Sequence, residues 1–282
     1  MNILVTGVNG QLGHDVVKLL DSKEHIVTGV DRKEMDITNE EAVKGKIREV
    51  KPDVIVHCAA YTNVDGAEND EEAAYQVNAL GTKYLAQAAK EIGAKMLFVS
   101  TDYVFEGNAS EPYEVDHPTN PIGAYGRTKL AGENFLKEIL DRFYIVRTAW
   151  VFGKNGKNFV KTMLRLGKER GEVGVVADQV GSPTYTMDLA KFIIELIQTE
   201  KYGTYHATNS GVCSWYEFAV EIFKQAGLSV KVNPLTTEQY PTPAKRPKYS
   251  VLSKAELEKQ GFTPLPDWKE ALHAYLKEIE EI

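Results

Sequence analysis

Cysteine is scarce in this chain, with only Cys58 and Cys213 among 282 residues. Two cysteines are too few for a disulfide scaffold, and they are better read as small buried hydrophobic residues in a reducing compartment. Met1 to Gly7 lacks the basic leader and long apolar run of a signal peptide. No apolar stretch approaches the roughly 20 residues that a membrane helix needs. We therefore expect a cytoplasmic protein that does not contact membranes.

An excess of positive charge is also missing, because the formal net charge is −7 at pH 7. This charge argues against a broad surface for nucleic-acid polymers, although a local basic pocket could still hold an anionic ligand. Neither His57 nor His206 has neighbours at metal-ligand spacing, so we expect no zinc site. With 43% hydrophobic residues and no repeats or long linkers, the chain has the composition of a globular protein of two lobes.

The first half of the chain alternates short apolar runs with longer helical patterns. Strands are predicted at residues 2–6, 25–30, 54–58, 95–100 and 143–149. Helices are predicted at residues 11–20, 40–50, 70–92 and 126–140. Strands separated by helices imply βαβ units, and right-handed crossovers favour a sheet covered on both faces. The predicted fold class is therefore α/β, with a Rossmann-type doubly wound parallel sheet.

The pattern changes after Trp150. Helices are predicted at residues 159–169, 186–199 and 214–226, with a strand at 173–177. Residues 234–247 are rich in proline, threonine and basic side chains, which predicts a surface or ligand-facing loop. We expect an NAD(P)-binding Rossmann domain at 1–150. A smaller α/β domain at 151–282 would be mainly substrate-binding, and parts of it could return to cover the first domain.

Three glycines follow the first predicted strand and open the first predicted helix. Gly7 would permit a tight turn, Gly10 would let the backbone approach a pyrophosphate, and Gly13 would let helix and strand pack closely. The helix N-terminus would supply amide donors to phosphates. The turn, including Asn9, Gln11 and Leu12, is therefore predicted to bind a dinucleotide cofactor.

The second predicted strand ends at Asp31, eighteen residues after Gly13. Asp31 can accept hydrogen bonds from an adenosine ribose, which favours NAD. Arg32 and Lys33 could instead hold a 2′-phosphate, which favours NADP. The residues leave NADPH and NADH both open as the cofactor.

Two further segments are expected to border the cofactor. Asp36 and Ile37 could flank the adenine, although a solvated turn explains them almost equally well. Cys58, Ala59 and Ala60 end the strand at residues 54–58, and their small side chains would let a cofactor pass over the strand end.

Tyr125 and Lys129 lie four residues apart, on one face of a predicted helix. A phenol is a poor acid at neutral pH, and a fixed ammonium beside it would lower its pKa. Thr101 follows a predicted strand, where its hydroxyl could hold a carbonyl oxygen. These residue types suggest transfer of a hydride and a proton to a carbonyl, with Tyr125 as the proton donor and Lys129 on the nicotinamide ribose.

The glycine turn, the Tyr-x-x-x-Lys pair and the preceding hydroxyl resemble the extended short-chain dehydrogenase/reductase superfamily. Further segments narrow the match and run in one order through almost all of the chain. Within the superfamily, the pattern resembles the dTDP-4-dehydrorhamnose reductase family. These segments are residues 57–65, 100–105, 125–133, 147–153, 178–184 and 214–218, with the pair at 246–247.

The resemblance implies a reductase of the C4 ketone of dTDP-4-dehydro-L-rhamnose that uses NADPH or NADH and yields dTDP-L-rhamnose. Thr101, Tyr125 and Lys129 would be catalytic, and the last two would also contact the cofactor. The nucleotide diphosphate would contact Arg246. The sugar would contact Thr101, Asp102, Tyr103, Val104, Phe105, Tyr125 and Trp150.

Departures from related patterns limit the alternatives. Sugar-nucleotide dehydratases typically follow the threonine with Asp-Glu, whereas Asp102 is followed here by Tyr103, which favours simple reduction. A sugar-nucleotide epimerase, a related 4-ketoreductase and a non-catalytic regulatory subunit of the methionine adenosyltransferase type stay open.

Some members of this family dimerise through magnesium, and a homodimer is compatible with the sequence. We place no metal site, and expect the acidic tail at residues 278–281 to be a solvated helix end. The natural deoxysugar, the oligomeric state and the preferred cofactor are not determined by the residues.

Overall fold

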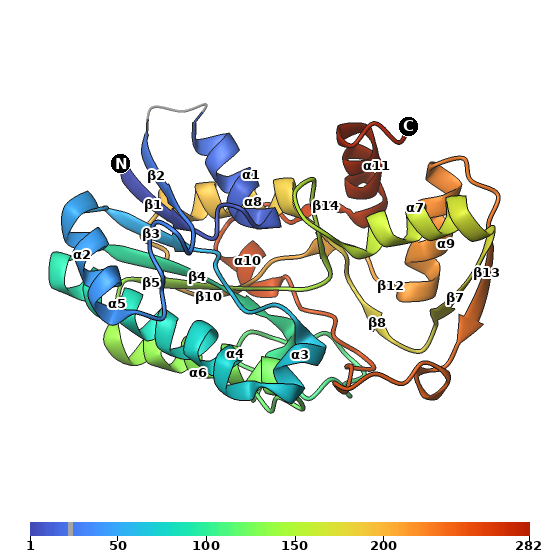
Figure 1. The fold of residues 1–282 in the computed structure, drawn as a ribbon, viewed down its shortest axis with the longest axis horizontal. Helices are drawn as coiled ribbons and strands as arrows, with labels where there is room; N and C mark the ends of the chain where they lie inside the picture. Colours follow the sequence, from blue (N-terminus) through green and yellow to red (C-terminus); the bar gives the residue numbers. More distant parts are fainter. Residues whose placement is uncertain (22–24) are drawn as a thin grey trace.

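A parallel six-stranded sheet lies at the centre of the computed structural model, which describes residues 1–21 and 25–282. The strand order is β2-β1-β3-β4-β5-β10, and every neighbouring pair is parallel (Figure 1). The strands are β1 (Asn2–Thr6), β2 (Ile26–Val30), β3 (Val54–His57), β4 (Lys95–Thr101), β5 (Phe143–Thr148) and β10 (Gly203–His206). The predicted doubly wound α/β class is confirmed.

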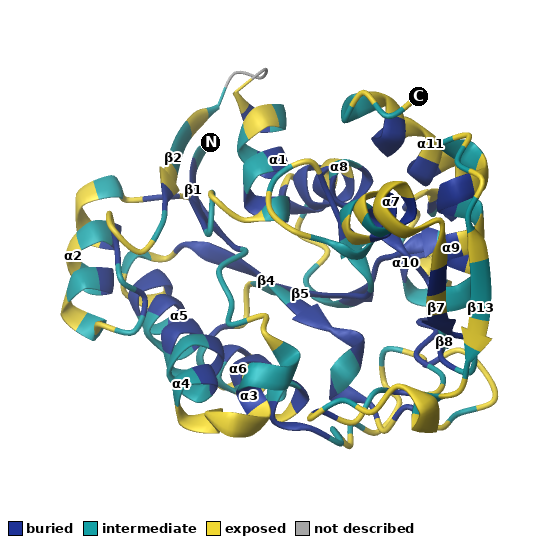
Figure 2. Ribbon diagram, turned by 45° about the vertical axis from the view of Figure 1, so that its right-hand side comes forward, coloured by how far each residue is buried: buried dark blue, intermediate teal, exposed yellow. Residues whose placement is uncertain are grey.

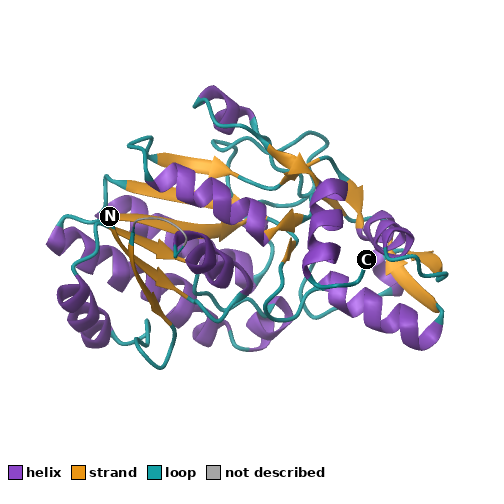
Figure 3. Ribbon diagram, turned by 90° about the horizontal axis from the view of Figure 1, so that it is seen from above, coloured by secondary structure: helices purple, strands orange, loops and turns teal. Residues whose placement is uncertain are grey.

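Alternate residues of each strand face opposite layers of helices, because side chains in a strand point to the two faces in turn. On one face, Ile3 and Val5 pack with α1 (Gln11–Leu20) and α8 (Thr186–Ile197). On the other face, Leu4 and Ile55 belong to the core cluster covered by the remaining helices of the layer. These are α2 (Glu40–Val50), α5 (Gly81–Ile92) and α6 (Ala124–Ile139). Seen from above in Figure 3, helices flank both faces of the strands.

The sheet has its topological switch point between β1 and β3. The chain leaves β1 for β2 on one side and then places β3 on the other side, so the two following loops diverge. The hydroxyl of Thr6 at the end of β1 bonds His57 Nδ1 at 2.8 Å and accepts from the Ala59 amide at 3.1 Å. These buried bonds fix the two strand ends beside each other, where open α/β sheets bind ligands.

The helix predicted at residues 70–92 is interrupted. A first helix, α3 (Val64–Asn69), precedes Asp70, whose side chain accepts from the Ala73 amide at 3.0 Å and caps α4 (Glu71–Tyr75). A π-helical turn, Gln76–Leu80, then joins α4 to α5. Asp70 is a strong N-cap residue, which explains why a new helix begins there.

The later chain builds a second group of elements with its own core. The longer ones are α7 (Phe159–Arg170), β7 (Glu172–Val176), α9 (Trp215–Gln225), β13 (Lys231–Leu235) and α11 (Trp268–Glu278). Shorter ones are β6 (Val151–Phe152), β8 (Val180–Gly181), β9 (Thr184–Tyr185), β11 (Asn209–Ser210), β12 (Cys213–Ser214), α10 (Ala255–Lys259) and β14 (Leu265–Asp267). β13 pairs with β7 in parallel beside α9, at the right of Figure 1.

Elements of the later chain, among them β10, α8 and α10, belong to the first layer system. β10 pairs with β5, and α8 packs against α1 on the central sheet. Figure 2 shows β4 and β5 as buried strands at the middle of the molecule, between exposed outer surfaces. The domain division at residue 150 stays a prediction. In the described part of the chain, no helix has the length and apolarity to cross a membrane.

Candidate active site

A cavity of about 850 Å³ opens at the carboxyl ends of β1, β3, β4 and β5. It brings together segments that lie far apart in the sequence, because parallel strands deliver their following loops to one edge. The predicted residues in its wall are Gly7, Asn9, Gly10, Gln11, Leu12, Gly13, Asp31, Cys58, Ala59, Ala60, Thr101, Asp102, Tyr103, Tyr125, Lys129 and Trp150.

In the glycine turn, backbone segments approach one another so closely that Gly7 and Gly13 leave no room for a Cβ atom. Gly7 has a φ of 71°, in the left-handed region, and a Cβ there would lie 2.7 Å from the amide nitrogen of Ala59. A Cβ on Gly13 would lie 2.3 Å from the carbonyl oxygen of Gly7. At Gly10, the N-cap of α1, no side chain caps the helix. Its first amides are therefore free of side-chain acceptors and suited to a phosphate.

A second cavity of about 470 Å³ adjoins the first and shares Gly7, Asp31, Ala59 and Ala60 with it. Its wall also contains the predicted residues Arg32, Asp36 and Ile37. The two cavities form a trough with space for both halves of a dinucleotide. The shape and lining therefore fit the cofactor that the sequence implies.

Both carboxylate oxygens of Asp31 accept hydrogen bonds from nearby backbone amides. Asp31 accepts from the Asn9 amide at 3.1 Å and from the Arg32 amide at 2.8 Å. The Arg32 side chain is 86% exposed, and its guanidinium lies 3.5 Å from Asp36. Hydrogen bonds from Thr38 lower the pKa of Asp36, and Arg32 lowers it further. The Arg32 guanidinium is thus exposed and paired with Asp36 at the end of the trough that both residues line.

Thr101, Tyr125 and Lys129 meet inside the larger cavity. Thr101 ends β4, whereas Tyr125 and Lys129 lie on one face of α6, one helical turn apart. The Lys129 ammonium donates to the Val99 carbonyl at 2.6 Å and lies 4.1 Å above the Phe98 ring centroid. These contacts hold the Lys129 side chain against the end of β4, in the wall of the cavity.

Burial sets the protonation of this group. It raises the pKa of the Tyr125 phenol, and the neighbouring Thr101 hydroxyl opposes the rise. Burial also lowers the pKa of Lys129 to about 7. The expectation that Lys129 lowers the phenol pKa is therefore wrong for the free protein. The physical reason is that desolvation disfavours the charged form of each residue, and the ammonium is bonded to Val99.

Two predicted sugar contacts lie elsewhere. Val104 and Phe105 are 0% and 1% exposed, in a cluster with Tyr113 and Leu252, and they are absent from the cavity wall. The expectation that they contact the sugar is corrected: their side chains fill the core behind the strand end. Tyr103, between them and Thr101, does line the cavity, and its ring meets the Tyr125 ring edge-on at 5.4 Å.

Trp150 lies in the cavity wall in a strained conformation. Its φ is 49°, in the left-handed region that non-glycine residues rarely adopt. Its ring stacks on Trp215, with centroids 3.6 Å apart and planes inclined by 12°. Trp215 thus forms the base of this stack and is not itself in the wall. Such strain persists only where the surroundings hold it, and it gathers at functional sites.

Arg246 lies outside the wall but contacts it. Its guanidinium forms an ion pair with Asp65 at 2.7 Å and donates to the Tyr103 hydroxyl at 3.1 Å. Asp65 also accepts from the Ala244 amide at 3.1 Å. The basic loop is therefore fastened to the first lobe beside the cavity.

Sequence reasoning missed a loop that crosses the glycine turn. Gly156 and Lys157 line the cavity, and Asn155 donates to the Asn9 carbonyl at 2.8 Å. Gln11 accepts from the Gly153 amide at 2.9 Å. The glycines and lysines of residues 153–157 were the available signal, but only the fold brings this loop to the turn. Other missed wall residues are Thr62, Val64, Val99, Ser100, Thr148, Ala149 and Val151.

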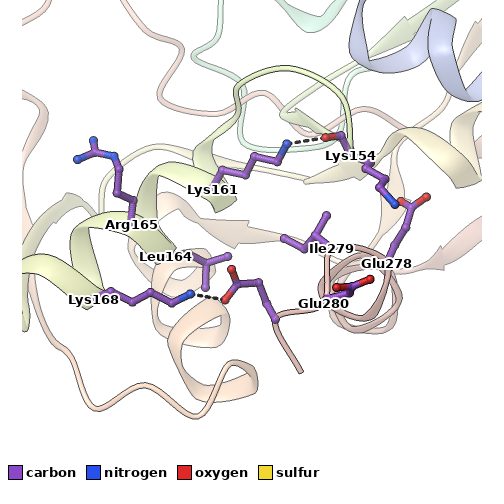
Figure 4. A pocket seen from close by; sticks show the side chains of 9 residues that line it. Lys154, Lys161, Leu164, Arg165, Lys168, Glu278, Ile279 and Glu280 are labelled. Carbon is purple, nitrogen blue, oxygen red and sulfur yellow. Dashed lines mark hydrogen bonds and ion pairs between the residues drawn. The ribbon is translucent and has the colours of Figure 1, made fainter.

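The acidic tail forms ion pairs with nearby lysines, and Figure 4 draws the one made by Lys168 as a dashed line. Glu281 pairs with Lys168 at 2.6 Å, and Glu278 pairs with Lys18 at 2.9 Å. Among the described residues, no group of three or more histidine, cysteine or acidic side chains is placed to hold a metal ion. The cavity beside the tail is lined by both acidic and basic side chains, including Lys154 and Lys161, and it shares no lining residue with the trough.

Comparison with known proteins gives a consistent family. Residues 1–281 match the family described as RmlD substrate binding domain. A dTDP-4-dehydrorhamnose reductase from Aggregatibacter actinomycetemcomitans is 45% identical, over 96% of each chain. A crystal structure of a dTDP-4-dehydrorhamnose reductase from Clostridium acetobutylicum is 50% identical, with a TM-score of 0.98 over 99% of this chain and 100% of that one.

A further solved structure is of dTDP-4-dehydrorhamnose reductase from Bacillus anthracis in complex with NADP. It is 48% identical, with a TM-score of 0.96 over 98% of each chain. The match extends through the glycine turn, the residues around Thr101 and Tyr125, and the later lobe alike. The family resemblance predicted from the sequence is confirmed: this chain belongs to the RmlD family, that of the dTDP-4-dehydrorhamnose reductases.

Proposed function

We propose that the protein is an NAD(P)H-dependent reductase of the C4 ketone of dTDP-4-dehydro-L-rhamnose, and that it yields dTDP-L-rhamnose. One observation carries the proposal: the glycine turn and the Thr101, Tyr125 and Lys129 side chains line a single cavity. Family membership over the whole chain supports the same reaction.

Bound NAD(P)H would supply the hydride. The α1 N-terminus and the turn at Gly7 to Gly13 would hold the pyrophosphate, and Asp31 and Arg32 would border the adenosine ribose. Lys129 would contact the nicotinamide ribose from the floor of the cavity. The Bacillus anthracis reductase was solved in complex with NADP, which supports the use of this type of cofactor here.

Thr101 and the neighbouring Tyr125 would bind the ketone of the substrate and protonate it. The Thr101 and Tyr125 hydroxyls would bind its oxygen, and Tyr125 would donate a proton as the alkoxide forms. The Tyr125 phenol is neutral at pH 7, because its ordinary pKa is near 10 and desolvation raises that pKa further. Neutrality is the state that a proton donor requires.

The remaining contacts would hold parts of the substrate that do not react. We assign the sugar ring to Trp150 and Tyr103, and the nucleotide diphosphate to Arg246. Asp102 lines the wall beside them. We also place the protein in the cytoplasm.

The test is a spectrophotometric assay of NADPH consumption with an enzymatically prepared dTDP-4-keto-6-deoxy sugar. We expect oxidation of NADPH that depends on both protein and sugar. A matched measurement of cofactor released from freshly purified, denatured protein separates the epimerase alternative. Tightly held NAD without NADPH consumption would favour an epimerase. The absence of both bound NAD and NADPH consumption would favour a non-catalytic role.

A further inference from the structure

Asp102 has one carboxylate oxygen in a hydrogen bond and one without. The residue is 3% exposed, and its Oδ1 accepts from the Thr101 hydroxyl at 3.0 Å. Its Oδ2 is buried and has no hydrogen-bond partner in the described part of the chain. An ionised carboxylate with an unpaired buried oxygen is costly, whereas a protonated one relieves that cost. The proposed mechanism gives this residue no role in proton transfer.

The groups around Asp102 leave it without a cation. Tyr125 of α6 and Tyr103 of its own turn are the titratable groups that face it, and the Ser250 hydroxyl lies beside it. Arg246 reaches only as far as the Tyr103 hydroxyl. Burial, the largest influence, raises the pKa of Asp102 to about 6, while Ser250 and Thr101 oppose the rise. Both protonation states are therefore accessible near neutral pH.

Thr101 lies between this carboxyl and the phenol. Its hydroxyl bonds Asp102, interacts with Tyr125, and is held by the Tyr103 amide at 3.2 Å. Lys129 is engaged elsewhere, because its ammonium donates to the Val99 carbonyl. A hydroxyl both donates and accepts, so it can pass a proton without net change.

We propose that Asp102 is a proton reservoir that recharges Tyr125 through the Thr101 hydroxyl. This inference rests on the proposed function and adds a route for its proton. After Tyr125 has protonated the alkoxide, its phenolate takes the Thr101 hydroxyl proton while Thr101 takes the carboxyl proton of Asp102. The O–H bond of Tyr125 is formed again, that of Asp102 is broken, and Thr101 keeps one proton. Water then protonates the Asp102 carboxylate after product release.

The first test is the pH profile of kcat for the wild type and for Asp102→Asn, under conditions where proton transfer to Tyr125 limits turnover. In the wild type, kcat should fall as rising pH ionises Asp102. Asp102→Asn cannot supply the proton, so kcat should drop by about tenfold or more and that alkaline limb should vanish. The Kd for NADPH should change by no more than about twofold. If Asp102→Asn kept the wild-type kcat and the alkaline limb of its pH profile, the proposal that Asp102 is a proton reservoir would be overturned.

Ser250→Ala tests the same idea while leaving the carboxyl in place. Ser250 favours the ionised form of Asp102, so its removal should move the alkaline limb to higher pH. A purely structural role of Asp102 predicts no such movement, and an unmoved limb would contradict the proposal even if Asp102→Asn failed to fold.

A double variant gives the third reading. Thr101→Val with Asp102→Asn should lose no more activity than Thr101→Val alone, because both lie on one path. Multiplied losses would show separate roles. A wild type that reduces no dTDP-4-keto sugar would defeat the proposed function itself. An active wild type with unaffected variants would defeat the reservoir alone.

Discussion

Lys129 is buried and Tyr125 is partly buried, and desolvation is the largest influence on the pKa of each side chain. The phenol is kept neutral and the ammonium is kept near its point of titration. Thr101 supplies the polar contact that this apolar setting otherwise lacks. The residue types and spacing were predictable because they depend on local helix geometry. Their pKa values were not, because desolvation depends on what the rest of the fold places around them.

Tyr125→Phe should lower kcat by roughly 10²–10⁴-fold, the usual contribution of general acid catalysis. Phenylalanine keeps the ring that packs beside Tyr103 but cannot donate the proton. Stopped-flow measurement of hydride transfer, with NADPH binding followed separately by fluorescence titration, checks both parts. Cofactor affinity should stay near that of the wild type. A variant with wild-type hydride-transfer rate would remove Tyr125 from the reaction.

Lys129→Met should stabilise the fold, most strongly at low pH. The folded pKa of Lys129 is about 7, against an ordinary value of 10.5, so the unfolded chain binds more protons between these values. Wild-type stability from this group therefore rises with pH across that window. The advantage of the methionine variant in urea unfolding should shrink from pH 7 toward pH 10. A constant difference would mean that Lys129 is not desolvated in the folded protein.

At the scale of elements, the glycine turn depends on how closely α1 approaches β1. The turn was readable from sequence because its three glycines lie within seven consecutive residues, directly after a predicted strand. The close approach of Ala59 to Gly7 was not readable, because it depends on the fold. The loop at residues 153–157 was not, because its place over the turn rests on bonds from Gln11 and Asn155 across the chain. The π-helical turn was also missed, because one helical pattern runs through residues 70–92, and the short helix α3 before Asp70 was not predicted.

Gly13→Ala should weaken NADPH binding by at least tenfold. The new Cβ would lie 2.3 Å from the Gly7 carbonyl oxygen, and backbone on both sides leaves little room to relax. Gly45→Ala in α2 is the matched control, because a Cβ there meets nothing within 4 Å. That control should raise stability by about 0.5–1 kcal/mol and leave affinity unchanged. Equal affinity in both variants, measured by calorimetry, would refute the steric account of the turn.

At the scale of the whole molecule, the later chain completes the earlier one. β10 closes the central sheet, α8 covers it, and Arg246 fastens the basic loop to Asp65. A strand of four residues such as β10 carries little periodic signal, and its partner β5 lies more than fifty residues earlier. The sequence therefore predicted the sheet without its last strand. Val104 and Phe105 were misplaced for a similar reason, because Leu252 of their core cluster lies far along the chain.

Arg246→Ala should raise the KM for the sugar nucleotide several-fold, with a smaller change in kcat, because the loop would hold a part of the substrate that does not react. It also leaves the Asp65 carboxylate without its partner beside the cavity, which would repel a diphosphate. Lys245→Ala removes the same charge from the adjacent, exposed position and serves as the control. Steady-state kinetics at low and moderate salt compare the two. An equal effect of both variants would show that the loop attracts the substrate only through its overall positive charge, without a specific contact from Arg246.

The most direct test of the account is the identity of the product. A coupled synthesis from dTDP-glucose would deliver dTDP-4-dehydro-L-rhamnose to the purified protein with NADPH labelled with deuterium at the transferable position of C4. NMR of the product sugar should show dTDP-L-rhamnose with the deuterium on C4, formed in proportion to the NADPH consumed. A recovered 4-keto sugar, or deuterium at any other carbon, would contradict reduction of the C4 ketone by this site.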